Sequence, residues 1–296
     1  MRQFTSVTDV PDVDALVREA LFIKQNPLKF NELGRNKTLG LVFLNPSLRT
    51  RVSTQIAAQN LGMNVVTINA DKDSWALEFG DGVVMNGNTV EHIRDAAPVL
   101  GSYCDVIGVR CFPGLHSRED DYSEHIMRQF LRYANKPYLS LESATLHPLQ
   151  SLADAITIAE HHPVHRPKVV LAWAPHIKPL PQAVANSFAE WMNRSDVDFV
   201  VTHPEGYELD PGYTGKAPIY YEQEKALEGA DFVYVKNWSS YTDYGKMPGN
   251  HPSWMLTERH LSLTNHARVM HCLPVRRNVE LSDEILDSRH SLVQAQ

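Results

Sequence analysis

The sequence predicts an α/β protein in which parallel β-sheets are flanked by helices. Short runs rich in β-branched residues, from TLGLVFL to RVMHCL, alternate with segments of helical periodicity, which is typical of parallel strands joined by crossover helices. The predicted strands cover 38–44, 64–68, 105–109, 138–142, 168–174, 198–203, 231–235 and 268–273. The predicted helices cover 11–26, 50–61, 89–100, 122–134, 148–161, 181–193 and 222–229. We expect Gly62 and Gly101 to end two of these helices.

The chain has 296 residues, which is enough for two domains of ordinary size. The first four predicted strands and the last four form two similar halves, joined by the predicted helix 148–161. We therefore expect one domain at 1–148 and a second at 149–296. Because open parallel sheets bind ligands at the carboxyl ends of their strands, we expect the active site in the interdomain cleft.

Composition narrows the class of partner and the compartment. A net charge of -7 and a pI near 6.0 oppose general affinity for nucleic acid or an anionic membrane, so an anionic ligand needs local cations. Three scattered cysteines suit a reducing compartment better than a disulfide framework. No stretch reaches the roughly 18 to 20 apolar residues of a membrane span, and the first residues lack signal-peptide features. We expect a cytoplasmic protein with no nucleic-acid or membrane partner.

The sequence predicts neither a metal nor an organic cofactor. His161, His162 and His165 fall in a proline-broken loop without a carboxylate or thiol partner, which disfavours a metal site. The motif G-x-G-x-x-G is missing, which argues against a dinucleotide enzyme.

The first candidate site follows the first predicted strand, where N-P-S-L-R-T-R runs into a predicted helix. A helix start offers unpaired N–H groups and a positive dipole end. The hydroxyls of Ser47 and Thr50 and the guanidinium of Arg49 can complete a phosphate cradle there. Taken alone, S-L-R-T would more often be an N-cap serine followed by solvated arginines.

Three further segments follow predicted strands: V-R ending at Arg110, H-P-L-Q starting at His147, and H-C-L-P-V-R-R starting at His271. Together with S-L-R-T-R, in this order and across nearly the whole chain, they resemble the aspartate and ornithine carbamoyltransferase family. The resemblance implies that the protein transfers a carbamoyl group from carbamoyl phosphate to an amine, without a cofactor, in arginine biosynthesis.

The resemblance also implies the role of each matched residue. The phosphate would be bound by Ser47, Leu48, Arg49, Thr50 and Arg110, and the carbamoyl end by His147, Gln150 and the backbone around Cys272 and Leu273. Arg110, His147 and Thr50 would polarise the carbonyl oxygen, where amine attack builds negative charge. On its own, His147 could equally be a packing or N-cap histidine before Pro148. We expect no covalent intermediate on Cys272, because neighbours in a strand point to opposite faces.

The segments E-S-A-T-L-H-P-L-Q, W-A-P-H-I-K-P-L-P-Q and A-D-F-V-Y-V-K-N-W resemble the N-acylornithine branch of the family. The S-M-G motif of ordinary ornithine enzymes is replaced here by V-K-N-W-S-S, and Lys236 would repel a free α-ammonium group. The branch implies acyl-substrate contacts from Glu142, His176, Lys236 and Arg276. It also implies a homotrimer in which Trp75, from the loop K-D-S-W, reaches the adjacent subunit's site and helps to bind carbamoyl phosphate there. Ordinary aromatic burial is the alternative for Trp75.

Val90 bears on the choice of acyl group. It stands where acetyl enzymes of the branch resemble one another in carrying Glu and succinyl enzymes carry Pro. Because a neutral residue does not repel a terminal carboxylate, we expect N-succinyl-L-ornithine as the acceptor, although Glu91 lies next to it.

Several alternatives stay open. They are an N-acetylornithine, ornithine or putrescine enzyme, or a catalytically inactive ligand-binding protein of the same fold. The family carries a further C-terminal helix after the segment at 291–296, and its absence here fits either a clipped sequence or a real loss. Retention of Arg49, Thr50, Arg110 and His147 favours an active enzyme.

Overall fold

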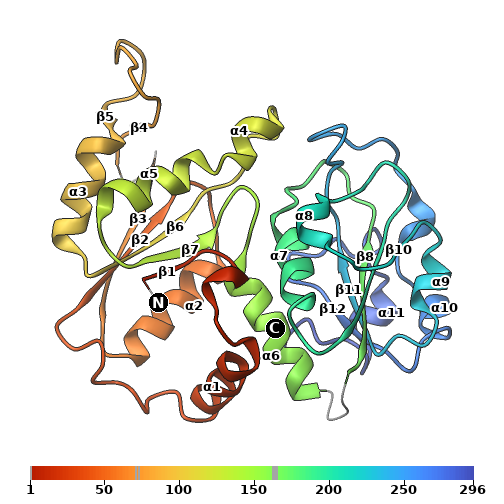
Figure 1. Cartoon of the computed structure of the whole chain (residues 1–296). Coiled ribbons are helices and arrows are strands. Elements are labelled where there is room, and N and C mark those ends of the chain that lie inside the picture. Colours follow the sequence, from red (N-terminus) through yellow and green to blue (C-terminus); the bar gives the residue numbers. More distant parts are fainter. Residues whose placement is uncertain (1, 71, 73, 162–165) are drawn as a thin grey trace. The chain divides into compact units, whose positions relative to one another are not determined.

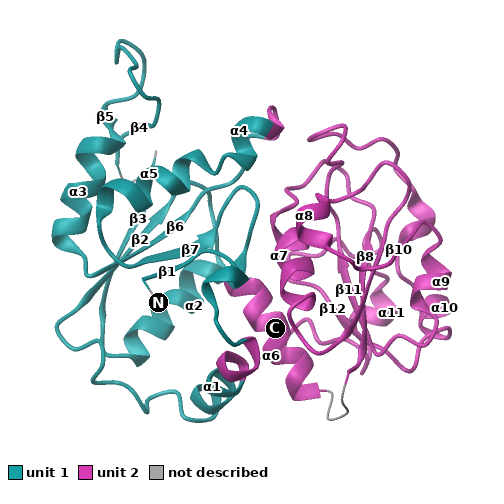
Figure 2. Cartoon of the chain, in the orientation of Figure 1, with its two compact units in different colours: residues 1–12, 18–114, 119–148 teal, residues 13–17, 115–118, 149–296 magenta. Residues whose placement is uncertain are grey.

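The computed structural model describes residues 2–70, 72, 74–161 and 166–296, and the chain forms two compact units (Figures 1 and 2). Unit 1 comprises residues 1–12, 18–114 and 119–148, and unit 2 comprises residues 13–17, 115–118 and 149–296. Two short segments, 13–17 and 115–118, thus belong to unit 2 although they lie within the first half of the chain. None of the helices in the described ranges is long and apolar enough to cross a membrane.

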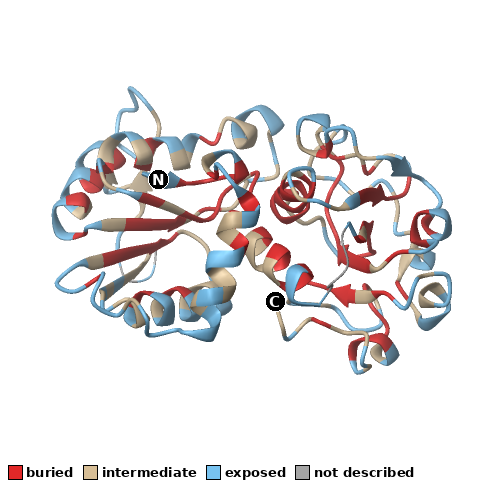
Figure 3. Ribbon diagram, turned by 60° about the horizontal axis from the view of Figure 1, so that its bottom comes forward, coloured by how far each residue is buried: buried red, intermediate tan, exposed pale blue. Residues whose placement is uncertain are grey.

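Unit 1 is built on a parallel sheet with strand order β1-β7-β6-β2-β3. Its strands are β1 (Gln3–Phe4), β2 (Thr38–Phe43), β3 (Asn64–Asn69), β6 (Val106–Arg110) and β7 (Tyr138–Glu142). Its remaining elements are η1 (Val7–Asp9), most of α1 (Val13–Gln25), α2 (Arg49–Asn60), β4 (Leu77–Glu78), β5 (Glu91–His92), α3 (Ile93–Tyr103), most of α4 (Arg118–Tyr122) and α5 (His125–Ala134). Helices cover both faces of the sheet, with α3 and α5 on one face and α2 on the other (Figures 1 and 3).

The core of unit 1 explains why α3 and α5 pack together. Val42, Ile107 and Val109 of the sheet form one buried cluster with apolar residues of both helices. Gly101 lies inside α3, where an added Cβ would come within 2.3 Å of the carbonyl oxygen of Ala134 in α5. The expectation that Gly101 ends a helix is therefore wrong, because this glycine permits close helix packing instead.

Unit 2 is built on a second parallel sheet, with strand order β10-β9-β8-β11-β12. Its strands are β8 (Lys168–Trp173), β9 (Asp198–Thr202), β10 (Ile219–Tyr220), β11 (Phe232–Lys236) and β12 (Arg268–Met270). Its helices are α6 (Pro148–His161), α7 (Ala183–Met192), α8 (Pro211–Thr214), α9 (Gln223–Leu227), η2 (Pro252–Trp254), α10 (Glu258–Leu261) and α11 (Asp283–Leu286).

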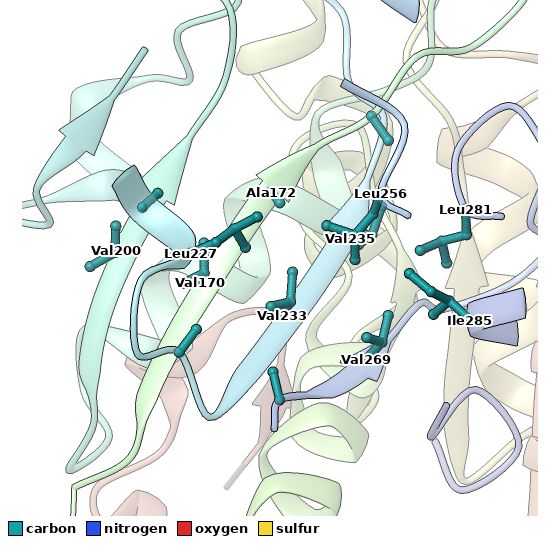
Figure 4. Packing of buried hydrophobic residues seen from close by; sticks show 14 of the residues in the cluster. Val170, Ala172, Val200, Leu227, Val233, Val235, Leu256, Val269, Leu281 and Ile285 are labelled. Carbon is teal, nitrogen blue, oxygen red and sulfur yellow. The ribbon is translucent and has the colours of Figure 1, made fainter. Parts of the chain in front are cut away.

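Alternate side chains of these strands fill two cores. On one face, Val170, Val233 and Val269 pack with Leu227 of α9 and Ile285 of α11 (Figure 4). On the other face, the ring of Tyr234 stacks on Phe188 of α7, with 4.2 Å between the ring centroids. Strands buried on both faces read as continuous apolar runs, which is why the sequence predicted them. The predicted α/β fold, with two parallel sheets flanked by helices, is confirmed.

Three predicted elements differ from the structure. The helix predicted at 89–100 begins only at Ile93, because residues 91 and 92 pair with β4. The helix predicted at 122–134 is interrupted at Glu124, which has a left-handed backbone with φ of 52°. The strand predicted at 268–273 ends at Met270, so His271 and Cys272 lie beyond it.

Candidate active site

The loop after β2 leads into α2 in the way that an anion site requires. Leu48 is the N-cap residue of α2, and its side chain makes no capping hydrogen bond. Ser47 and Thr50 are half-buried, whereas Leu48 and Arg49 are exposed. The loop is fixed from behind by the backbone N–H of Phe112, which donates to the Asn45 side chain at 2.6 Å. The first turn of a twelve-residue helix, with its N–H groups and positive dipole end, is thus set beside two hydroxyls and a guanidinium.

Arg110 is the last residue of β6 and is held in place by three hydrogen bonds. Its Nε and Nη2 donate to one carboxylate oxygen of Glu142, at 3.1 and 2.9 Å, and its Nη1 donates to the carbonyl oxygen of Pro46 at 2.5 Å. Its guanidinium also lies 4.5 Å from the ring centroid of Phe112. Charge-assisted pairs of this kind fix direction as well as position. Arg110 is therefore tied to the loop that carries Ser47 and leads into Thr50 of α2.

A β-bulge aligns Arg110 with Glu142. Val109 of β6 pairs with Ser140 of β7, but the next residue, Arg110, pairs with Glu142, so Leu141 is skipped. Bulges of this kind re-aim side chains and are frequent beside active sites.

His147 lies at the end of the loop that follows β7 and is only 8% exposed. Its Nε2 is 3.5 Å from the Glu142 carboxylate. Burial lowers the pKa of His147, and the charge of Arg110 acts in the same direction. The charge of Glu142 opposes them, but the net effect is a lowered pKa. The imidazole is therefore neutral near pH 7. Its Nδ1 is buried and has no hydrogen-bond partner within the described residues. A buried nitrogen without a partner among the described residues is compatible with a partner supplied by a substrate.

Glu142 was predicted to contact the acylated substrate. In the structure its carboxylate is engaged by Arg110 and by His147. Its role within the described contacts is to orient these two donors.

Trp75 and Val90 lie close together in unit 1. Trp75 is 54% exposed, and Val90 is 64% exposed, so the alternative that Trp75 is an ordinary buried aromatic is wrong. The indole Nε1 of Trp75 donates to the carboxylate of Glu91 at 2.7 Å, and the N–H of Val90 donates to the carbonyl of Ala76 at 2.9 Å. Of the predicted loop K-D-S-W, residue 73 lies outside the described residues.

Gln150, in the first turn of α6, is oriented by a buried carboxyl group. Its Nε2 donates to Oδ1 of Asp154 at 2.9 Å, and the side chain of Gln296 donates to the same oxygen at 2.7 Å. Burial raises the pKa of Asp154 to about 7, and these two hydrogen bonds act in the opposite direction. Asp154 was not predicted from the sequence, since one acid in a helix gives no signal of burial.

The cationic residues of unit 2 gather around one carboxylate. Nε of Arg276 donates to Nε2 of His176 at 3.0 Å, so the other ring nitrogen of His176 carries the proton and donates to the carbonyl of Lys178 at 2.8 Å. Burial lowers the pKa of His176, which agrees with this neutral form. Lys236, the last residue of β11, is buried.

Glu280 supplies the negative charge of this group and was not predicted. Its carboxylate accepts from the backbone N–H of Arg276 at 2.8 Å and lies 3.3 Å from Nε2 of His271. Burial alone would raise the pKa of Glu280, but the hydrogen bond and charge of His271 and the charge of Lys236 bring it below its ordinary value. Glu280 is therefore an ionised carboxylate that compensates the buried cation of Lys236.

Cys272 and Leu273 follow β12 in an irregular segment. Leu273 has a left-handed backbone, with φ of 50°, and its N–H donates to Nδ1 of His271 at 3.0 Å. Both ring nitrogens of His271 are thus engaged, one by Leu273 and one by Glu280. The argument from opposite strand faces is wrong because neither residue is in a strand, but the engaged imidazole is no base for a Cys272 thiolate.

Among the described residues, no group of three or more His, Cys, Asp or Glu side chains is placed to hold a metal ion. Two of the histidines considered for a metal, His162 and His165, lie outside the described residues.

Comparison with protein families matches both parts of the chain. Residues 2–160 match the model described as "Aspartate/ornithine carbamoyltransferase, carbamoyl-P binding domain", and residues 181–296 match "Aspartate/ornithine carbamoyltransferase, Asp/Orn binding domain".

Among curated proteins, the chain is 52% identical over 295 residues to an N-succinylornithine carbamoyltransferase of Bacteroides fragilis, covering 99% of this chain and 93% of the relative. An N-acetylornithine carbamoyltransferase of Xanthomonas axonopodis pv. citri is 37% identical over 298 residues, covering 94% and 86%.

Solved structures give the same grouping. An N-acetyl-L-ornithine transcarbamylase variant with a glutamate replaced by valine, complexed with carbamyl phosphate and N-succinyl-L-norvaline, matches with a TM-score of 0.93 and 35% identity, covering 100% of this chain and 95% of that one. An acetylornithine transcarbamylase complexed with acetylcitrulline also matches with a TM-score of 0.93, at 34% identity over 100% and 94% of the two chains.

Proposed function

We propose that this protein transfers the carbamoyl group of carbamoyl phosphate to the δ-amine of N-succinyl-L-ornithine. The chain belongs to the aspartate/ornithine carbamoyltransferase family. The products are N-succinyl-L-citrulline and phosphate. In this proposal, residues 1–148 bind carbamoyl phosphate and residues 149–296 bind the N-acylornithine.

One observation carries the choice of reaction. The guanidinium of Arg110 is fixed by hydrogen bonds to Glu142, and Nε2 of the neutral His147 imidazole lies 3.5 Å from the same carboxylate. Arg110 is also bonded to the loop that opens α2. This arrangement offers donors for a carbonyl oxygen next to an anion site, which is what attack on carbamoyl phosphate requires.

The mechanism follows from these positions. The phosphate binds at the start of α2, through Ser47, Leu48, Arg49 and Thr50, with Arg110. Arg110, His147 and Thr50 stabilise the charge that develops on the carbonyl oxygen as the neutral amine attacks. Gln150 and the backbone at Cys272 and Leu273 hold the carbamoyl group. Removing one such donor typically raises the barrier by about 2.7 to 4 kcal/mol.

The acceptor's carboxylates are assigned to the cationic group of unit 2. Lys236 and His176 are buried, whereas Arg276 is exposed, and the charge of Glu280 limits the cost of burying the Lys236 cation. Lys236 disfavours an acceptor with a free α-ammonium group.

The acyl group is assigned from Val90 and from the relatives. A neutral side chain at position 90 leaves room for a charged succinyl tail, and the acid beside it, Glu91, is engaged by Trp75. The solved variant that carries valine in place of a glutamate holds N-succinyl-L-norvaline, which supports this assignment. The greater identity to N-succinylornithine enzymes, 52% against 37%, points the same way.

Assembly and location are further parts of the proposal. An exposed Trp75 suits a homotrimer in which this side chain completes the adjacent subunit's site. Cys104, Cys111 and Cys272 form no disulfide within the described residues, which suits the cytoplasm.

A colorimetric ureido assay tests the proposal. Purified protein is given carbamoyl phosphate with N-succinyl-, N-acetyl- or free L-ornithine in parallel. The largest kcat/KM is expected for N-succinyl-L-ornithine. Preference for N-acetylornithine would overturn the acyl assignment, and no product from any acceptor would overturn the transferase itself.

A further inference from the structure

We propose that Glu124 is a positioning residue for His147, because its carboxylate holds the loop that carries this histidine. The inference rests on the proposed function. It concerns residues 143–146, the short connection between the end of β7 at Glu142 and the start of α6 at Pro148.

The loop forms a closed turn. The backbone N–H of Ser143 donates to the carbonyl of Leu146 at 2.8 Å, and the N–H of Leu146 donates to the Ser143 hydroxyl at 3.2 Å. Glu142 and His147 flank this turn, so the geometry of the turn sets the distance between them.

The carboxylate of Glu124 binds the donors that the turn presents. One oxygen accepts from the Ser143 hydroxyl at 2.6 Å, the Thr145 N–H at 2.8 Å and the Thr145 hydroxyl at 2.5 Å. The other oxygen accepts from the N–H of Ala144 at 3.3 Å. Glu124 is only 9% exposed, and hydrogen bonds of a buried carboxylate to several donors fix both partners strongly.

The backbone of Glu124 is also special. It interrupts the predicted helix 122–134 with a left-handed conformation, φ 52° and ψ 36°, immediately before α5. This conformation is unfavourable for a residue with a side chain. Residues held in this way persist only where the surrounding contacts over-determine them, and they cluster at functional sites. Here the over-determining contacts are those to the turn.

The consequence concerns donor geometry. His147 lies 3.5 Å from Glu142, which in turn fixes Arg110. Donors that stabilise a developing oxyanion act only when they are already in place, and small displacements lower the rate sharply. Glu124 touches neither substrate nor reacting atom in this proposal, and it acts through the turn.

The test uses Glu124→Gln in the full-length protein. Glutamine keeps the size and one acceptor oxygen, but it removes the charge and turns an amide N–H₂ toward a donor. We expect kcat with N-succinyl-L-ornithine to fall ten-fold or more, with the Kd of carbamoyl phosphate within three-fold of the unmodified protein. Thr145→Val, which removes one of the bonded hydroxyls, should lower kcat by a smaller factor.

The matched control is Asp9→Asn. The Asp9 carboxylate binds a similar donor set in unit 1, from the N–H and hydroxyl of Thr5, the N–H of Ser6 and the side chain of Gln3, at 2.7, 2.7, 3.3 and 3.0 Å. This segment carries no candidate site residue. Asp9→Asn should therefore lower Tm but leave kcat unchanged.

Three results would overturn the proposal for Glu124. One is a lower Tm with unchanged kcat in Glu124→Gln, which is the behaviour of the control. Another is an equal loss of carbamoyl phosphate affinity, which would mean that the whole site is disturbed. If Glu124→Gln does not fold, unchanged kcat in Thr145→Val overturns it instead.

A readout without turnover separates this proposal from the proposed function. The ring nitrogen resonances of His147, assigned with a His147→Gln variant, should shift in Glu124→Gln and stay in place in Asp9→Asn. An unmodified protein that transfers no carbamoyl group would end the proposed function, and unchanged His147 resonances would still end the positioning role.

Discussion

Replacing Asp154 by Asn should change how the stability of the protein depends on pH. Asp154 is fully buried, and burial raises the pKa of its carboxyl group to about 7 from an ordinary value of 3.8. Asparagine has the same shape and keeps the oxygen to which Gln150 and Gln296 donate. The substitution therefore removes the ionisation and leaves these hydrogen bonds in place.

The sign and size follow from the two pKa values. Because folding raises the pKa, the unfolded chain releases this proton first as pH rises, and folding is then penalised. The penalty is absent below about pH 3.8, grows from there to about pH 7, and is constant above. One pKa unit corresponds to about 1.36 kcal/mol, so a shift of roughly three units corresponds to about 4 kcal/mol. Asp154→Asn should be more stable than the unmodified protein at pH 8 by up to this amount.

Urea unfolding of both proteins at pH 4.5, 6 and 8 measures the effect. Other titrating groups are shared, so their contributions cancel in the difference between the two free energies of unfolding. A difference that stays constant within about 1 kcal/mol over this range would show that Asp154 does not carry a raised pKa, and the reasoning would be refuted.

Three further predictions concern the reaction. Val90→Glu should move the ratio of kcat/KM values from N-succinyl- toward N-acetylornithine by more than ten-fold. Two carboxylates about 4 Å apart repel by roughly 4 kcal/mol at an effective dielectric of 20, and by less where solvent enters. A change in this ratio below three-fold would contradict the prediction. Arg49→Ala and Arg110→Ala should each weaken carbamoyl phosphate binding ten-fold or more in calorimetry. The control Arg35→Ala should not, because it removes an exposed arginine paired only with Glu32 in the described contacts. If the Arg49 and Arg110 variants bind as tightly as the unmodified protein, the assignment of the anion site is wrong. Where the chemical step limits the rate, kcat/KM for the acceptor should rise with pH and then level, because only the neutral amine attacks. His147 does not add to this rise, because burial lowers its pKa and it is already neutral. A flat profile from pH 6 to 9 would contradict the prediction.

The sequence predicted the central strands of the sheets well because these strands are buried on both faces. TLGLVF and KVVLAW became β2 and β8, and Arg110 ends β6 as expected. The strands that were missed, β1, β4, β5 and β10, have two residues each, too few for any periodicity. One of them, β5, displaced the start of α3.

The candidate site was predictable only where a motif carried it. S-L-R-T and H-P-L-Q named Arg49 and His147, but no motif marks Glu124, Asp154 or Glu280. Donors farther along the chain satisfy the carboxylates of Glu124 and Asp154, and the irregular segment after β12 supplies the donors to Glu280, so these pairings depend on tertiary structure. The pairing of Arg110 with Glu142 was likewise hidden, because it depends on a bulge rather than on spacing.

That bulge restricts which changes of length the protein tolerates. Leu141 is skipped between the pairs Val109–Ser140 and Arg110–Glu142, and it is fully buried. Deleting one residue of β7 between Ser140 and Glu142 would restore regular pairing and rotate the following side chains by one position. The bulge that aligns Glu142 with Arg110 would then be lost, together with the buried side chain of Leu141. Substitutions in this strand can preserve the site, whereas insertions and deletions there are expected to abolish it.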